Sequence, residues 1–289
     1  MTEIPEPADR QGPAPREIER ARVWLAKRGV RVAHPTRFLG VRIGGLQTGA
    51  GSTMVVSYLI FMPLAVAGTV GYLALQKLLG VQSVRMTEST PLYFVFCALQ
   101  LVGWRLGRLQ ERAVGKRLAV RSTSRPWREV LGGWYLAALS ITFGGGALLG
   151  IAMVVTTSSA RTYAWSWLGL LAIGAICTAV ILRSVLRAPA VADDEASSIV
   201  DELLHTEYAD ATLPAMYTMP VLLDLLLENR QPHAFTGLLV AYAVLSVGVQ
   251  TVGVLRHRRR ALPPGNYGQP YPLPGATEPI VGWAPPKPA

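Results

Sequence analysis

Residues 130–155 form an uncharged, apolar stretch of 26 residues, and four further apolar stretches occur along this 289-residue chain. A helix needs about 20 apolar residues to cross the hydrocarbon core of a bilayer. A helix also satisfies its backbone hydrogen bonds internally, which the absence of water inside a membrane demands. The sequence therefore predicts an all-α fold, a polytopic bundle of transmembrane helices.

Charged residues make up only 16% of the chain, whereas an average soluble protein has about 25%. They lie mainly between the apolar stretches, so we expect one membrane domain with polar ends. Cys97 and Cys177 fall inside apolar stretches, where a thiol behaves as a small hydrophobic group, and we expect no disulfide framework. Arginine is far more frequent than lysine, a composition typical of GC-rich bacteria, so we expect the bacterial inner membrane.

The chain divides into three parts. Residues 1–52 form a basic cytoplasmic region, residues 53–255 the membrane domain, and residues 256–289 a basic stop with a tail rich in Pro, Gly and Tyr. We expect both ends of the chain to be disordered, because such composition cannot build a core. The predicted spans are about 54–75, 91–106, 130–155, 163–182, 213–228 and 235–255.

Charge placement favours six spans over five. Cytoplasmic loops are enriched in Lys and Arg. Six spans place 24 basic residues inside and four outside, whereas five spans without 213–228 place 20 inside and eight outside. Six spans also put both termini in the cytoplasm. Residues 213–227 would cover only about 22 Å as a helix, short of a bilayer core of about 30 Å, so a five-span bundle with a re-entrant or surface helix stays an alternative.

Residues 15–29 have the start and stop signals of a helix. Pro15 suits the first helical position, and Lys27 and Arg28 precede a terminating Gly29. Ile18, Ala21 and Leu25 share one face, so the helix is amphipathic. It could lie on an anionic membrane surface or pack on the bundle.

Two segments of opposite charge lie between the spans. The basic loop 105–128 has eight Lys or Arg residues and a single acid, Glu111. The acidic segment 188–212 contains no Lys or Arg. Both segments are expected to face the cytoplasm, so they could dock on one another through their opposite charges. The basic loop could also bind anionic lipid headgroups.

Asp201, Glu202 and His205 have helical spacing within the acidic segment and could share a face. One histidine with two flexible carboxylates would bind a metal only weakly. A solvated acidic helix is the simpler interpretation, and we predict neither a metal site nor a catalytic site.

Three polar side chains are expected inside spans. Asp224 is the single acid within an apolar segment, where a carboxylate marks an ion or proton path unless it reaches the interface. Gln100 and Gln250 could form hydrogen bonds between helices.

Small residues follow the third span at helical spacing, a pattern that lets helices approach closely in lipid. We predict a packing face, either within the bundle or between two copies, and local bending at the run of three glycines. The residues are Gly133, Ala137, Ser140, Gly144, Gly146 and Gly150.

These observations favour a non-enzymatic scaffold or partner-binding component of the inner membrane, with no cofactor. The alternative is a small transporter or channel subunit, with a path lined by Gln100, Gln250 and Asp224. The expected partners are the lipid bilayer, anionic lipid headgroups, and a protein partner or a second copy of the chain. We expect no nucleic acid, because membrane topology accounts for the basic charge.

Overall fold

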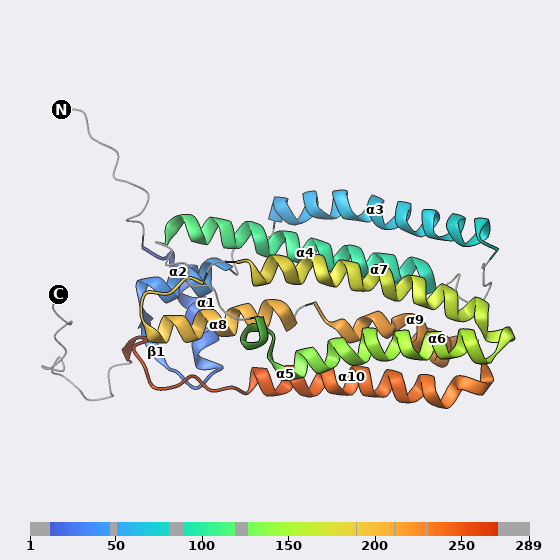
Figure 1. Cartoon of the computed structure of the whole chain (residues 1–289). Coiled ribbons are helices and arrows are strands. Elements are labelled where there is room, and N and C mark those ends of the chain that lie inside the picture. The colour runs from blue at the N-terminus through green and yellow to red at the C-terminus, as the bar shows by residue number, and fades with distance from the viewer. Residues whose placement is uncertain are drawn as a thin grey trace, which may run out of the picture.

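The structure, a computed structural model, describes residues 12–46, 51–80, 89–118, 127–188, 190–210, 212–228 and 231–270. It is mostly helical, and within these residues five helices are long and apolar enough to cross a membrane. They are α3 (Gly51–Leu78), α4 (Ser89–Arg117), the continuous pair α5 (Trp127–Leu139) and α6 (Gly146–Thr156), α7 (Arg161–Leu186), and α10 (Thr236–Arg258). Figure 1 shows these helices side by side along one long axis.

The second helix is longer than its predicted span. α4 continues through residue 117, so residues 105–117 of the expected basic loop are helical. Their Arg, Leu, Gln and Glu side chains are good helix formers, which lets the helix continue beyond its apolar half. Residues 119–126 of that loop lie outside the described residues.

The third span is interrupted at its glycines. Gly132 has a φ of 68° inside α5, and a π-helical segment at Ser140–Gly145 joins α5 to α6. A π turn widens a helix locally, and this one includes Gly144 and Gly145, whereas a bend at the glycine run stays a prediction. The run of glycines tolerates this turn because glycine has no Cβ to crowd it.

Aromatic side chains form the core of the bundle. Tyr93 on α4 and Tyr217 lie fully buried with ring centroids 5.9 Å apart. Trp167 on α7 packs edge-on against Tyr242 on α10, with 5.3 Å between their centroids. Edge-to-face packing of this kind stabilises aromatic pairs beyond their buried area. These contacts join α4, α7 and α10 around the segment that contains Tyr217.

That segment is the weakest of the predicted spans, and its structure is irregular. A 3₁₀ turn at Pro214–Thr218, the short helix α9 (Met219–Leu223) and a π-helical turn at Asp224–Glu228 follow one another. In Figure 1 this segment continues from α8 (Glu195–Asp210) along the bundle, and α10 returns toward the end that carries α1 (Pro15–Ala26). Pro220 removes a backbone donor within it, which accounts for the break in regular helix.

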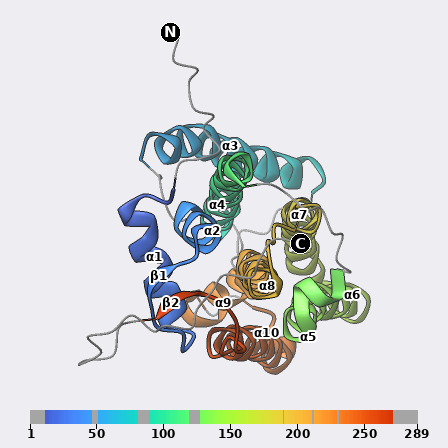
Figure 2. The ribbon, with the colours of Figure 1, turned by 90° about the vertical axis from the view of Figure 1, so that its left-hand side faces the viewer.

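Both ends of the described chain fold together at one end of the bundle. We name this part the terminal platform. It consists of α1, β1 (Val32–Pro35), α2 (Arg37–Leu46), α8 and residues 261–270, which include β2 (Gly268–Pro270). Seen from that end, α8 lies near the centre, with α2 and the long helices around it (Figure 2). The core of the platform contains Ala21, Trp24, Leu25, Leu39, Ile43, Val200, Leu203, Leu262 and Tyr267.

The prediction of a disordered tail is wrong for residues 261–270. β2 pairs antiparallel with β1, with Val32 opposite Pro270 and Pro35 opposite Gly268. Tyr267 is only 4% exposed, and its hydroxyl donates to the carbonyl of Pro263 at 2.8 Å. The sequence favoured an extended chain but did not indicate that it would pair with β1. Residues 271–289 and 1–11 lie outside the described residues.

We expect Gly268→Ala to release residues 261–270 from β1. Gly268 has a φ of 130°, and an added Cβ would collide with the carbonyl oxygen of His34. Backbone strain of this kind costs about 1–3 kcal/mol. Amide hydrogen exchange across residues 262–270 should therefore accelerate, whereas Gly115→Ala on α4, which has open space around its Cβ position, should leave it unchanged. Unchanged exchange in Gly268→Ala would contradict the pairing.

Candidate functional site

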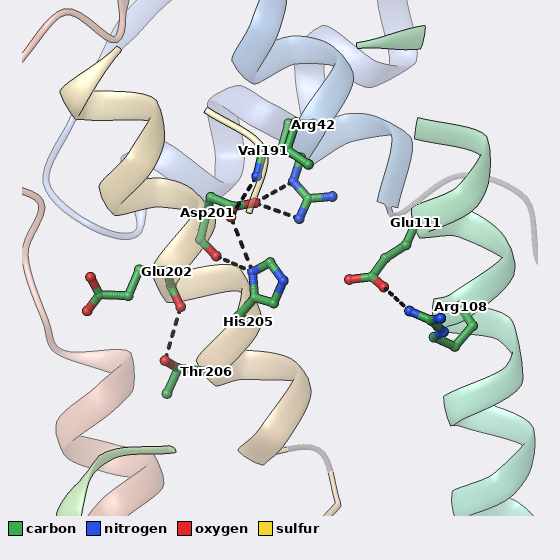
Figure 3. A network of polar contacts seen from close by, with 8 residues as sticks. All are labelled: Arg42, Arg108, Glu111, Val191, Asp201, Glu202, His205 and Thr206. Atoms are coloured by element: carbon green, nitrogen blue, oxygen red, sulfur yellow. Dashed lines mark hydrogen bonds and ion pairs between the residues drawn. The ribbon is translucent and has the colours of Figure 1, made fainter. Parts of the chain in front are cut away.

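The candidate site is a polar network that joins the helices of the terminal platform to one another and, through Glu17 and Arg117, to α4. Its centre is Asp201 on α8, which is 0% exposed. Arg42 on α2 reaches this carboxylate with two nitrogens, Nε at 2.9 Å and Nη2 at 2.6 Å from Oδ1. The backbone N–H of Val191 donates to Oδ2 at 3.2 Å (Figure 3). Asp201 therefore fixes α8 both to α2 and to the segment that precedes α8.

Burial makes this ion pair sensitive to change. Removing two charges from water costs several kcal/mol each, and good geometry with further hydrogen bonds is needed to offset that cost. Asp201 has these hydrogen bonds on both oxygens. Loss of one partner would leave the other charge buried and unpaired.

His205 adds to the same network but does not complete a metal site. Its Nδ1 lies 2.8 Å from the carbonyl oxygen of Asp201 and 3.4 Å from Oδ2 of the same residue. Glu202 points elsewhere, and its carboxylate lies 3.5 Å from Nη1 of Arg260. No group of three His, Cys, Asp or Glu side chains that could hold a metal ion occurs among the described residues. Asp201 and His205 thus share a face, as predicted, and Glu202 does not.

The picture of α8 as a solvated acidic helix is wrong. Val200, Leu203 and Leu204 are buried along with Asp201. Three of the acids on this helix contact separate segments: Asp201 contacts α2, Glu202 contacts Arg260, and Glu207 contacts Arg28 and Trp24 at the end of α1. α8 is therefore the element on which the platform assembles.

Glu207 connects α8 to the end of α1. Its carboxylate pairs with Arg28 and accepts a hydrogen bond from Nε1 of Trp24 at 3.2 Å. The guanidinium of Arg28 also lies over the Trp24 ring, 3.8 Å from its centroid, a cation–π arrangement. The indole thus supports the arginine while both contact one carboxylate.

Glu17 connects the start of α1 to α4. Arg117 donates to both its oxygens, at 2.7 and 3.1 Å, and the backbone N–H of Ala14 donates at 2.8 Å. Burial alone would raise the pKa of Glu17, but the hydrogen bonds from Arg117 and Ala14 lower it below the ordinary value. Glu17 is therefore an ionised cap and an anchor to α4 at the same time.

The predicted docking between acidic and basic segments differs from what the structure contains. Within the described residues, the acids of α8 pair with Arg28, Arg42 and Arg260, all outside residues 105–128. α8 does approach α4, where a Cβ on Gly107 would lie 3.2 Å from the ring of Tyr208. That contact is packing, whereas Arg117 in the basic segment pairs with Glu17 of α1.

The three intramembrane polar residues lie in different surroundings. Asp224 is 1% exposed and interacts electrostatically with the hydroxyl group of Tyr163 on α7. Gln250 on α10 accepts a hydrogen bond from the backbone N–H of Ala215 at 3.5 Å. Gln100 lines a cavity of about 300 Å³ between α4, α7 and α8, which neither Asp224 nor Gln250 lines. Asp224 is thus inside the bundle, and the three side chains do not share one cavity.

The small residues of the third span fall into two groups. Gly146 and Gly150 are buried, and added Cβ atoms would lie 2.8 Å from the Tyr242 hydroxyl and 2.6 Å from Leu168. Gly133 and Gly144 have nothing within 4 Å of a Cβ position, and Ser140 is exposed. Close packing within the chain therefore involves Gly146 and Gly150. Ala137 is partly exposed, and its neighbours Gly133, Ser140 and Gly144 on the other part of the stripe are exposed. A contact of Gly133, Ala137, Ser140 and Gly144 with a second copy of the chain stays a prediction.

Sequence reasoning did not single out Arg42. It is the one charged residue in the otherwise apolar run 38–46, and all but two residues of α2 are buried. A lone arginine in an apolar helix needs a buried acid, and Asp201 was available as its partner. That signal was present in the sequence, although the sequence could not identify which acid it pairs with.

We expect Arg42→Ala to destabilise the platform by about 3–5 kcal/mol, because it leaves Asp201 buried without its partner. Replacing both residues, as Arg42→Met with Asp201→Leu, should recover most of this loss. Arg22→Ala is the control, since its pair with Glu19 at 3.0 Å is largely exposed and should contribute less than about 1 kcal/mol. Thermal unfolding of the full chain in detergent measures all three. Equal effects of Arg42→Ala and Arg22→Ala would contradict the buried pair.

Comparisons with known proteins complete the description of the site. No protein-family model matches the chain, no curated protein matches it, and no solved structure matches it. The residues themselves therefore carry the functional argument: five long helices apolar enough to cross a membrane, with an ion-paired platform made from both ends of the described chain.

Proposed function

We propose that this chain is a non-enzymatic scaffold or partner-binding protein of the bacterial inner membrane. One observation carries the proposal: segments from both ends of the described chain are fixed to α8 by buried contacts. The Arg42–Asp201 pair fixes α2 to α8, β2 pairs with β1, and Leu262 and Tyr267 share an apolar core with α8. A rigid surface at one end of a membrane bundle is suited to binding a protein partner, because little ordering is needed on association.

We further propose six crossings, with the terminal platform in the cytoplasm. The segment 214–228 would form the fifth crossing, and α10 would return to the platform end. Its buried residues support this, since Pro214, Tyr217 and Val221 lie inside the bundle and not on its outer surface. Irregular backbone is tolerated at membrane depth where protein surrounds it, so a short, interrupted segment is sufficient here.

A small transporter or channel subunit is a second candidate, and Asp224 is the observation that favours it. A buried carboxylate inside a membrane bundle is costly and is often part of an ion or proton path. The separate surroundings of Gln100, Gln250 and Asp224 weigh against a path lined by all three. Scaffolding is therefore the first proposal and transport the second.

The six-crossing topology predicts that a fluorescent protein fused after Ala289 will fluoresce, because such a fusion matures in the cytoplasm. A fusion to alkaline phosphatase at the same position should be inactive. An active phosphatase fusion would place the platform in the periplasm and would exclude six crossings with this orientation.

The scaffold proposal predicts specific crosslinks from the platform surface. A photoreactive residue in place of Val23 on α1, which is 46% exposed, should give a discrete adduct with one protein in native membranes. The control is the same residue in place of Leu148 on α6, which is 72% exposed and faces outward from the bundle; it should give lipid adducts alone. Protein adducts of equal yield at both positions, or none at Val23, would contradict a partner on this surface.

The transport alternative predicts that Asp224→Asn abolishes a proton or cation flux that wild-type proteoliposomes support. Asn is nearly the same size, so a loss would follow from the missing charge. Gln100→Leu serves as the control, because Gln100 lies in a separate cavity. If Asp224→Asn leaves flux at the level of the wild type, Asp224 has a structural role.

A further inference from the structure

Five arginines converge on one groove between α4 and α7, on the membrane side of the terminal platform. The groove has a volume of about 500 Å³. Arginines at positions 105, 108 and 112 follow one face of α4, and those at 183 and 187 follow one face of α7. Its lining residues are Phe61, Trp104, Arg105, Arg108, Leu109, Arg112, Val180, Arg183, Ser184 and Arg187.

Within the part of the chain that the structure describes, acids compensate little of the charge in this groove. Arg108 is 3.4 Å from Glu111 on the same helix, as Figure 3 shows. Among the described residues, no acid pairs with Arg105, Arg112, Arg183 or Arg187. Like charges held this close repel one another unless an anion lies between them. The groove therefore has the electrostatics of an anion site.

Part of the groove wall is apolar and continues into the exposed apolar surface of α7. Phe61 from α3 and Val180 from α7 line it. Val180 is 47% exposed, and Ile176, one turn further into the membrane, is 66% exposed. A ligand in the groove would therefore meet guanidinium groups at one end and a hydrocarbon surface at the other.

Two buried polar atoms of lining residues also lack partners. Within the described residues, Nε1 of Trp104 and Oγ of Ser184 have no hydrogen-bond partner. Buried donors of this kind are normally satisfied. Both belong to residues that line the groove, but the two atoms themselves are buried, so the arginines are the groups that a ligand would contact.

We propose that this groove binds an anionic phospholipid of the leaflet next to the platform. The arginines would bind the phosphate through paired N–H donors, which match phosphate geometry better than lysine does. The acyl chains would lie along Phe61, Val180 and the apolar surface of α7. A soluble phosphate would use the arginines but leave the apolar wall unoccupied. Basic pockets between transmembrane helices are an established way to hold anionic headgroups.

The site depends on membrane insertion and not on the proposed protein partner, so the two proposals can fail separately. The test uses full-length protein in a neutral detergent, titrated with phosphatidylglycerol, with bound lipid counted by native mass spectrometry. Arg183→Gln with Arg187→Gln should weaken binding by about tenfold or more. Both side chains are exposed, so these substitutions should leave the fold intact, which the melting temperature without lipid verifies.

The matched control is Arg258→Gln with Arg259→Gln, which removes two exposed arginines from the end of α10, outside the groove. It should bind phosphatidylglycerol like the wild type. Arg105→Gln with Arg112→Gln, on the opposite wall, should reproduce the loss and keeps the test valid if the α7 variant unfolds. Equal weakening in the control would show a diffuse surface charge effect and overturn the site.

Two further ligands separate a lipid site from other anion sites. Phosphatidylcholine with the same acyl chains should bind at least tenfold more weakly, because its headgroup is zwitterionic. Glycerol phosphate, which has the phosphate without the chains, should not displace phosphatidylglycerol at equal concentration. Equal binding of phosphatidylcholine, or displacement by glycerol phosphate or by an acidic peptide, would overturn the proposal of an anionic lipid.

Discussion

The buried ion pair between Arg42 and Asp201 fixes two helices of the terminal platform, α2 and α8, to one another. An arginine in an apolar helix and an acid on a buried helix face are each costly alone. Together they fix α2 against α8, with the backbone of Val191 completing the set of contacts. The outer pairs, Glu207 with Arg28 and Glu17 with Arg117, then position α1 against α8 and α4. The remainder of the platform packs on this frame.

The platform and the bundle follow different physical rules. In the bundle, close approach at Gly146 and Gly150 and aromatic edge contacts hold the helices, as expected where lipid supplies no hydrophobic drive. In the platform, an ordinary apolar core is surrounded by ion pairs, as in a small soluble domain. Glu17 of the platform pairs with Arg117 of α4, and Tyr208 of α8 packs against Gly107 of α4, so these contacts join α4 to the platform.

Much of the membrane architecture could be predicted from sequence, because apolar length and charge placement are local properties. The five long helices follow from stretches such as 130–155, and the start of α1 follows from Pro15. The platform could not be predicted in the same way. Its contacts join Arg42 to Asp201 and Pro35 to Gly268 across most of the chain, and a single sequence carries no direct signal of such pairing. The predicted span was shorter than α4 because we took the first arginines after the apolar residues to mark the end of the helix. Charged residues end the apolar part of a helix, but the helix itself can continue.

Hydrogen exchange of the wild-type protein in nanodiscs, followed residue by residue, measures whether α2, α8 and residues 261–270 open as one unit. The buried pair and the strand pairing predict that protected amides in all three segments exchange with a similar opening free energy, and that added denaturant lowers it in parallel. Exchange of residues 261–270 at the rate of an unstructured peptide, or opening of α2 independently of α8, would contradict a platform built on Asp201.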